Sequence, residues 1–280
     1  MGRLKLSALS GAMLLLMPFS ADVLAADLPD IPPPPPPPLE IGHSWYLRGH
    51  IGMANQHFDG LTHPLIEQAI ADDDVFQWLD KGEFDAVPTF GIGIGWRHSD
   101  KLRFDATAEY RGKSSFSALD YYDVDTGAAD DEGTNNYTGK KSEYLFMVNG
   151  YYDFHDWHGI TPYVGAGIGA SLNIIDDFRD TNTTTGNQAY APSGSQWNFA
   201  WALHAGVGIQ ASPNLTVDLG YSFVSLGDAQ TGILQTAGVA CSTCAPVTFK
   251  SLYSHDFKLG IRYAFDKQAY PDYGPAMVKY

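Results

Sequence analysis

Charged residues, and basic residues in particular, are scarce in this chain of 280 residues. Only 18% of the residues are charged, and 17 Lys and Arg against 32 Asp and Glu give a net charge of −15. This balance argues against nucleic acid or an anionic membrane leaflet as the main partner. Long apolar runs are also missing, since the one such run, residues 6–19, is shorter than the roughly 20 residues that a membrane-spanning helix needs. A bundle of membrane-spanning helices is therefore excluded.

Hydrophobic residues, glycine and aromatic residues are plentiful by comparison. Hydrophobic residues make up 44% of the chain, which is enough to build a core and excludes a chain that is disordered throughout. The 29 glycines, 16 tyrosines and 13% aromatic residues favour β structure. Soluble proteins and transmembrane β-barrels remain as the candidate classes.

The N-terminal segment has the composition of an export signal. Residues 1–26 combine Arg3 and Lys5, the apolar run and small residues at 23–26, which predicts a cleaved secretory signal peptide, because the run is too short for an anchor. Residues 27–43 contain seven consecutive prolines at 32–38 and predict a polyproline II spacer in the periplasm. A peptide ligand for an aromatic groove is the alternative for this stretch.

From residue 44 onward, apolar side chains recur at every second position. In the clearest segment Trp197, Phe199 and Trp201 share one face, while the residues between them are small or polar. A period of two predicts strands with one apolar face. The segment at 143–154 fits least well, because Leu145 and Met147 fall on its polar face. The eight predicted strands are residues 44–56, 87–97, 101–111, 143–154, 161–173, 197–210, 214–227 and 249–265.

The lengths of these segments distinguish a membrane barrel from a soluble sandwich. Strands of soluble proteins average about 5 to 6 residues, whereas a tilted strand that crosses a bilayer needs about 9 to 11. The gaps between the segments are alternately long and short, at 30, 3, 31, 6, 23, 3 and 21 residues. The sequence therefore predicts an all-β fold: an eight-stranded antiparallel up-and-down transmembrane β-barrel over residues 44–265, exported to the bacterial outer membrane, with its short turns in the periplasm.

Charged residues recur on the polar faces of the predicted strands. An eight-stranded barrel is only wide enough for its side chains to fill it, so charges that point into the lumen must pair. Four basic groups, four acidic groups and one histidine predict a structural network of salt bridges rather than an open pore. The predicted lumen residues are Arg48, His50, Arg103, Asp105, Glu109, Glu143, Asp218, Lys258 and Arg262.

Several strand motifs together resemble a known family. They are WYLRGHIG (45–52), TPYVGAGIGAS (161–171), NFAWALHAGVGIQASPNLTVDLGYSFVSLGDA (198–229) and SHDFKLGIRYAF (254–265). These segments are similar to the small outer-membrane barrels of alphaproteobacteria, the opacity-protein and OmpA-like family of surface antigens. The resemblance covers residues 44–265. It implies an abundant structural surface protein without catalytic residues or a cofactor, and in some members host contact or haemin binding.

The family resemblance also implies a signal for barrel assembly on the last strand. Alternating apolar residues that end in an aromatic residue match that pattern: Phe257, Leu259, Ile261, Tyr263 and Phe265. The implied partners are the barrel-assembly machinery, outer-membrane lipid and lipopolysaccharide. Residues 266–280 follow the signal and are expected to form a periplasmic tail, too short for a peptidoglycan-binding domain.

Two other motifs look like functional motifs, but their sequence context favours structural roles. Cys241 and Cys244 favour a structural disulfide in an exported chain over a redox motif or half of a zinc site, since no second Cys pair or His-x-His completes a metal site. The glycine runs at 91–95 and 165–169 are not followed by a helix, so they predict space for larger neighbours on the lumen face rather than a phosphate loop.

The histidines and serines do not predict a catalytic site. His204 is expected to point into the lumen, and the neighbouring pairs at 98–99 and 254–255 point to opposite faces, so no nucleophile, base and acid are expected to meet. His57 and His63 are interpreted as solvated loop residues, with haem ligation as the alternative. Residues 64–71 have helical spacing and predict a short amphipathic helix.

The predicted function is a structural one at the cell surface, contributing to envelope integrity and displaying long loops. An adhesin or a haemin receptor that acts through the loops is the alternative, and a narrow channel is the third reading. The lumen charges nearly cancel, so the acidity belongs to the loops, where it favours basic host or environmental ligands.

Overall fold

The computed structural model describes residues 44–71, 75–123, 132–236 and 245–265, all within the compact unit of residues 41–280. The predicted signal peptide, proline spacer and C-terminal tail lie outside the described residues, as do Cys241 and Cys244.

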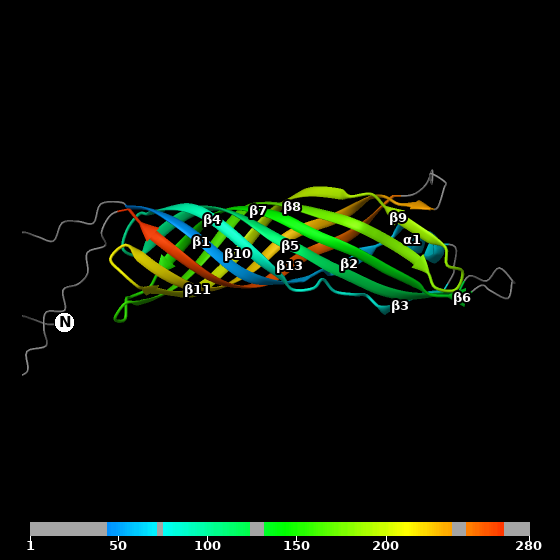
Figure 1. Cartoon of the computed structure of the whole chain (residues 1–280), viewed down its shortest axis with the longest axis horizontal. Coiled ribbons are helices and arrows are strands. Elements are labelled where there is room, and N and C mark those ends of the chain that lie inside the picture. Colours follow the sequence, from blue (N-terminus) through cyan, green and yellow to red (C-terminus); the bar gives the residue numbers. More distant parts are fainter. Residues whose placement is uncertain (1–43, 72–74, 124–131, 237–244, 266–280) are drawn as a thin grey trace, which may run out of the picture. The chain divides into compact units, whose positions relative to one another are not determined.

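Eight long strands form a closed antiparallel ring (Figure 1). Each strand pairs with the next, and the last strand pairs back with the first, so the ring has no free edge. The predicted eight-stranded barrel is confirmed. In ring order the strands are β1 (Ser44–His57), β4 (Val87–Arg97), β5 (Leu102–Asp123), β7 (Asn135–Asp153), β8 (Ile160–Asn182), β10 (Gly194–Gln210), β11 (Leu215–Ile233) and β13 (Pro246–Ala264).

The lower part of this ring, next to the short turns, has the surface of a membrane protein. Outward side chains there are large, apolar and exposed, as in Ile92 (72% exposed), Phe199 (65%) and Phe257 (67%). Aromatic rings gather toward both borders of this band, for example Trp96 near Phe104 at one border and Tyr110 near Tyr144 at the other. Because short turns are periplasmic in outer-membrane barrels, we expect the opposite end of the ring to face the outside of the cell.

The strands continue far beyond this band, which corrects the prediction of long loops. Strands β5 and β8 have 22 and 23 residues, about twice the length that crosses a bilayer. Most of the predicted loop at 112–142 is strand, since β5 ends at Asp123 and β7 begins at Asn135. The barrel therefore has a lower, membrane-facing half and an upper half in water.

The two halves have opposite patterns of burial, and β-bulges separate them. In β5 the even positions Phe104 and Tyr110 face outward, whereas Phe116 and Ala118, of the same parity, are buried inside. The register of β5 against β7 shifts between Arg111 and Ser114, so one additional residue reverses the faces.

Three other strands carry the same reversal. Two consecutive residues that are not buried mark the change in β8 at 176–177, in β11 at 227–228 and in β13 at 250–251. Asp177, Gly227 and Ser251 have left-handed backbones, with φ of 54°, 71° and 55°. Apolar residues that continue in phase along the sequence thus face lipid below the bulges and the interior of the barrel above them.

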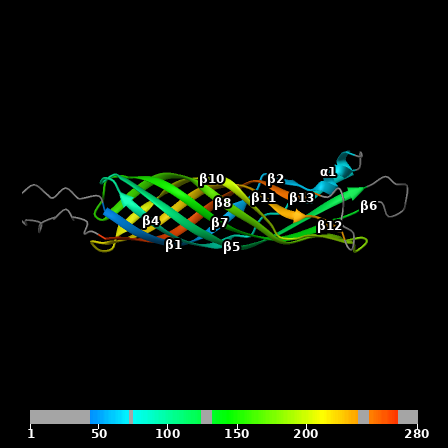
Figure 2. The same ribbon diagram turned by 90° about the horizontal axis from the view of Figure 1, so that it is seen from above.

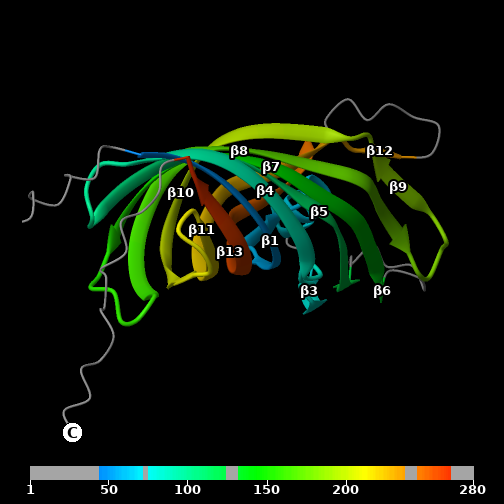
Figure 3. The same ribbon diagram turned by 60° about the vertical axis from the view of Figure 1, so that its left-hand side comes forward.

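Short elements complete the upper half (Figures 2 and 3). The predicted helix is confirmed as α1 (Pro64–Ala71). In the described part of the chain, no helix has both the length and the apolar character to cross a membrane. The remaining strands are β2 (Gly60–Thr62), β3 (Val75–Asp80), β6 (Glu132–Gly133), β9 (Gln188–Ala191) and β12 (Gln235–Thr236).

Deleting Lys113 should prevent the barrel from folding. The deletion removes the additional residue of the β5 bulge, so Phe116 and Ala118 would turn toward water and the neighbouring Ser115 and Ser117 toward the core. We expect the electrophoretic shift between unheated and boiled samples in detergent to disappear. Deleting Thr184 from the exposed turn after β8 is the control and should leave the shift intact. Equal behaviour of the two deletions would contradict the role of the bulge.

Candidate functional site

Ion pairs fill the part of the lumen nearest the short turns. Tyr46 donates a hydrogen bond from its hydroxyl to Asp105 at 3.2 Å, and the guanidinium of Arg103 lies 3.9 Å from the centre of the Tyr151 ring. Tyrosines of β1 and β7 thus contact members of this layer. The three ion pairs are Arg48–Asp105 (2.6 Å), Arg103–Asp153 (2.9 Å) and Arg262–Asp218 (2.7 Å).

A second ionic layer is centred on Arg111, whose side chain is fully buried. Its guanidinium donates two hydrogen bonds to Asp256, at 2.6 and 3.2 Å, which is the bidentate geometry that arginine favours. The Nε atom of Arg111 lies 2.9 Å from both Glu109 and Glu143. Three carboxylates from three strands thus converge on one cation.

Two lysines and a histidine complete this layer. Lys258 and His50 both contact Glu109 at 2.6 Å. Lys141 pairs with Glu143 and donates a hydrogen bond to Gln56 at 2.7 Å. The two layers together join six acidic and six basic residues, so these layers carry no net charge apart from His50.

The nine predicted lumen residues all take part in these contacts. The prediction missed four further members of the network: Arg111, Lys141, Asp153 and Asp256. Their parity could have revealed them, because Asp256 shares a face with Lys258, and Lys141 and Asp153 share one with Glu143. The inward Leu145 and Met147, which fitted the alternation poorly, are buried beside the network.

Glycines on the lumen face make room for the larger members, as predicted. A Cβ atom on Gly91 would lie 2.1 Å from the His50 ring, and one on Gly95 would lie 2.1 Å from the Tyr46 ring. Both distances are impossible for real atoms, so these positions accept only glycine while the neighbouring rings keep their places.

A histidine and a serine meet in the lumen, although no acid among the described residues orients the histidine. The Nδ1 atom of His204 lies 2.8 Å from the Ser222 hydroxyl, and its Nε2 atom lies 3.1 Å from the Asn149 side-chain oxygen. The enclosed space beside them measures only about 40 Å³, which holds water but no organic substrate. The arrangement satisfies buried polar groups and does not expose a nucleophile.

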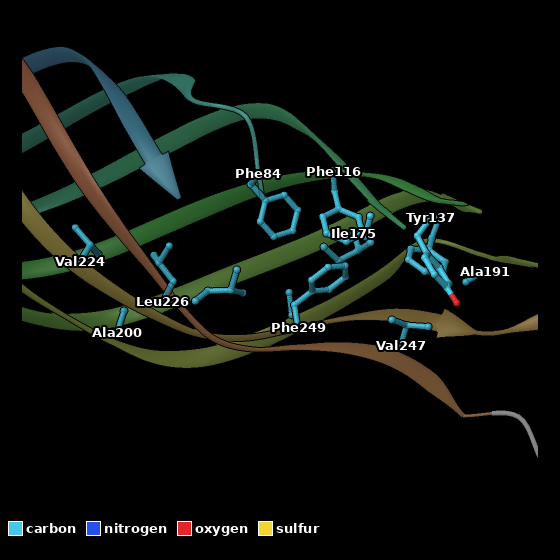
Figure 4. Packing of buried hydrophobic residues seen from close by; sticks show 14 of the residues in the cluster. Phe84, Phe116, Tyr137, Ile175, Ala191, Ala200, Val224, Leu226, Val247 and Phe249 are labelled. Atoms are coloured by element: carbon cyan, nitrogen blue, oxygen red, sulfur yellow. The ribbon is translucent and has the colours of Figure 1, made fainter. Parts of the chain in front are cut away.

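Four phenylalanines close the lumen above the ionic layers, and Figure 4 shows three of them, Phe84, Phe116 and Phe249. The rings of Phe58, Phe84, Phe116 and Phe249 contact one another with centroids 4.9 to 5.9 Å apart. The Nζ atom of Lys141 lies 5.7 Å from the centre of the Phe84 ring, so the aromatic layer rests directly on the ionic one. The sequence prediction missed this core because it assigned three of these residues, Phe58, Phe84 and Phe116, to loops.

Polar groups reappear inside the outer end of the barrel. Asp120 is fully buried and accepts hydrogen bonds from the Tyr137 hydroxyl at 2.5 Å and from the backbone and side chain of Asn135. Asp180 lies 3.5 Å from Nε2 of His63. Burial and the charge of Asp120 raise the pKa of Asp180 to about 7, and burial lowers the pKa of His63 to about 4.

His57 and His63 do not converge on a common ligand. His57 lies on the outer wall and stacks on Tyr253 with centroids 5.4 Å apart. His63 is 1% exposed and packs against Tyr137 and Phe178 inside the barrel. The interpretation of His63 as a solvated loop residue is therefore wrong, and the pair does not form a haem site.

Replacing Arg111 by Met should destabilise the barrel by about 3 to 5 kcal/mol, because three buried carboxylates would lose their shared cation. The measurement is the urea concentration at which the heat-modifiable folded form is lost. The matched control is Lys113→Met, which breaks an exposed 3.5 Å pair with Asp176 and should cost about 0 to 1 kcal/mol. Equal losses of stability in the two variants would show that Arg111 stabilises the barrel no more than an exposed ion pair does.

Comparisons with known proteins agree with this architecture. A family model described as outer membrane protein beta-barrel domain matches residues 13–265. An uncharacterized protein of Brucella abortus is 27% identical and is matched over 79% of this chain and 84% of its own length. The outer membrane protein PagN of Salmonella typhimurium is 30% identical over 62% of this chain and 72% of its own length. A putative adhesin of Rickettsia bellii is 25% identical over 79% of this chain and 87% of its own length.

The matched family region includes every described strand from β1 to β13. The closed ring, the lipid-facing band and the family match all indicate a β-barrel of the outer membrane. The chain belongs to the outer membrane protein β-barrel domain family and is a protein of the bacterial outer membrane.

Proposed function

We propose that the protein is a closed surface-display barrel. Its lower half anchors it in the outer membrane, and its upper half presents a rigid acidic surface to partners outside the cell. The observation that carries the proposal is the continuation of five strands, each of 19 residues or more, beyond the lipid-facing band and around a separate apolar core. An anchor alone does not need a second core in water.

The filled lumen argues against the third reading, a narrow channel. A solute would have to pass two ionic layers and then the four packed phenylalanines. Each layer is held by side chains from several strands, so movement of a single side chain does not open a path. The network thus has a structural role: it fills and stabilises the anchor.

The charge of the upper half indicates the kind of partner. Residues 58–86, which include β2, α1 and β3, have eight acidic residues and one basic residue. Asp59, Glu67, Asp80, Glu83 and Asp85 are exposed. Such a surface attracts basic partners and repels polyanions at short range. The names of the Rickettsia relatives, putative adhesins, are consistent with a role in surface contact.

The proposal agrees with the sequence predictions on lipid partners, the assembly signal and envelope integrity. Lipid and lipopolysaccharide would surround the lower wall, and the outward row from Phe257 to Phe265, exposed at 47% to 67%, would be the assembly signal. Because ion pairs fill the lumen of the anchor, the anchor would also contribute to envelope integrity. We propose no enzymatic activity, because the one histidine–serine pair described above is enclosed in the lumen.

The purified protein should give no stable conductance in planar bilayers. The variant Phe84→Ala with Phe249→Ala should also be silent, because the ionic layers below remain intact. Large and stable single-channel steps from the wild type would overturn the closed-barrel proposal. Steps from the double variant alone would show that the phenylalanines, and not the ion pairs, form the seal.

Neutralising the acidic surface should reduce attachment. The triple variant Asp80→Asn, Glu83→Gln, Asp85→Asn removes three exposed charges and should lower adhesion of the bacteria to host cells several-fold. Lys81→Gln is the control in the same segment and should not lower it. Dye leakage measures the envelope in parallel. Full adhesion by the triple variant, or an adhesion loss that accompanies leakage, would contradict the proposal.

A further inference from the structure

A polar hollow of about 320 Å³ lies at the outer end of the barrel. It lies between the beginning of β7, the end of β8 and the short strands β9 and β12. All but one of its described lining residues carry a side-chain oxygen. Those polar residues are Asn135, Asp180, Asn182, Asn187, Gln188 and Thr236.

Asp180 is a buried acid without an effective counter-charge. Its side chain is only 9% exposed, and the described chain offers it one ionic contact, the 3.5 Å approach of His63. That distance is too long for a good charge-assisted hydrogen bond. His63 is itself 1% exposed, and both its ring nitrogens lack hydrogen-bond partners. Since burial lowers the pKa of His63 to about 4, this ring is neutral at pH 7 and does not compensate the acid.

A second buried acid makes the shortage of positive charge worse. Asp120 has no cationic partner among the described residues and is held by Tyr137 and Asn135 alone. Its charge is one of the two causes that raise the pKa of Asp180. A cation in the hollow would relieve both carboxylates at once.

The rim beside the hollow also has acidic residues without basic partners among the described residues. Asp123 of β5 and Glu132 of β6 lie directly opposite each other, although like charges at such a position destabilise an antiparallel pair. Glu132 accepts a hydrogen bond from the Tyr121 hydroxyl at 2.8 Å, and neither acid has an ion-pair partner among the described residues. Glu132 lies three residues before Asn135, which lines the hollow.

We propose that this hollow binds the ammonium group of a lysine side chain on a basic protein partner, with the Asp180 carboxylate as the main acceptor. The side-chain oxygens of Asn187 and Gln188 would accept the other two ammonium hydrogens, and Asp123 and Glu132 would attract neighbouring basic residues. The inference rests on the proposed display function and assigns its partner a chemical class.

The lining distinguishes an ammonium group from a divalent metal ion. Calcium takes six to eight oxygen ligands and is usually held by several carboxylates. Among the described residues, only one carboxylate lines the hollow, and no three or more His, Cys, Asp or Glu side chains are grouped so that they could hold a metal ion. An ammonium needs three acceptors, which one carboxylate and two amides provide.

The test is calorimetric titration of the purified barrel in detergent with the peptide acetyl-Gly-Lys-Gly-amide. We expect binding at pH 8, release of a proton near pH 7, and affinity that rises roughly tenfold from pH 6 to pH 8 as Asp180, with a pKa of about 7, loses its proton. The same peptide with an acetylated lysine should not bind.

Asp180→Asn should weaken binding at least tenfold and abolish its pH dependence. Because this change removes an unpaired buried charge, the variant should fold, which its electrophoretic heat shift verifies. Glu67→Gln removes an exposed charge on α1 and should change the affinity less than twofold. No binding of the lysine peptide, equal binding of its acetylated form, or binding of calcium chloride alone in its place would overturn the proposal. If the peptide fails while the acidic-surface variant still reduces adhesion, the lysine site is wrong and the display function stands.

Discussion

Side chains alternate strictly between the two faces of a strand, and every other feature of this barrel depends on that constraint. Lipid surrounds the lower half, so apolar side chains must face outward there. Water surrounds the upper half, so they must face inward. A strand whose apolar residues keep one phase along the sequence cannot satisfy both demands without a change of face, and the bulges in β5, β8, β11 and β13 supply that change at the boundary. The left-handed residues Asp177, Gly227 and Ser251 provide the local backbone geometry.

The same constraint determines what fills the interior. Below the bulges the inward face receives the polar residues, and within a space without bulk water they must neutralise one another. Arg111 therefore has three carboxylate neighbours, and the neighbouring layer consists of closed pairs. Above the bulges the inward face receives phenylalanines, which pack as in a soluble protein. One barrel wall thus encloses a polar interior and an apolar interior, one above the other.

The sequence predicted the lower half well because its period of two, its strand lengths and its alternating gaps all follow from the bilayer. It predicted the upper half poorly because an alternation of apolar and polar residues that continues along the sequence does not show where a bulge exchanges the two faces of the strand. Phe116 and Phe249 keep the parity of the lipid-facing residues of their strands, and only the registers show that they turn inward. His63 was misplaced for a related reason, since a polar residue directly before a proline, in a segment without strand periodicity, gave no sign of the enclosure around it. The contacts of Lys141 and Asp256 required the ring to be closed, because their partners come from other strands.

The buried acids of the ionic layers and those at the outer end of the barrel differ in whether a basic residue compensates their charge. Each acid of the two ionic layers has a basic partner within 2.9 Å. Asp120 is buried as deeply and Asp180 almost as deeply, yet the described chain gives them hydroxyl, amide and neutral imidazole neighbours only. Where the barrel must merely be stable, its buried charges are compensated from within. Where it opens toward the outside, the compensation is missing, and a cation supplied by another molecule would complete the same arrangement.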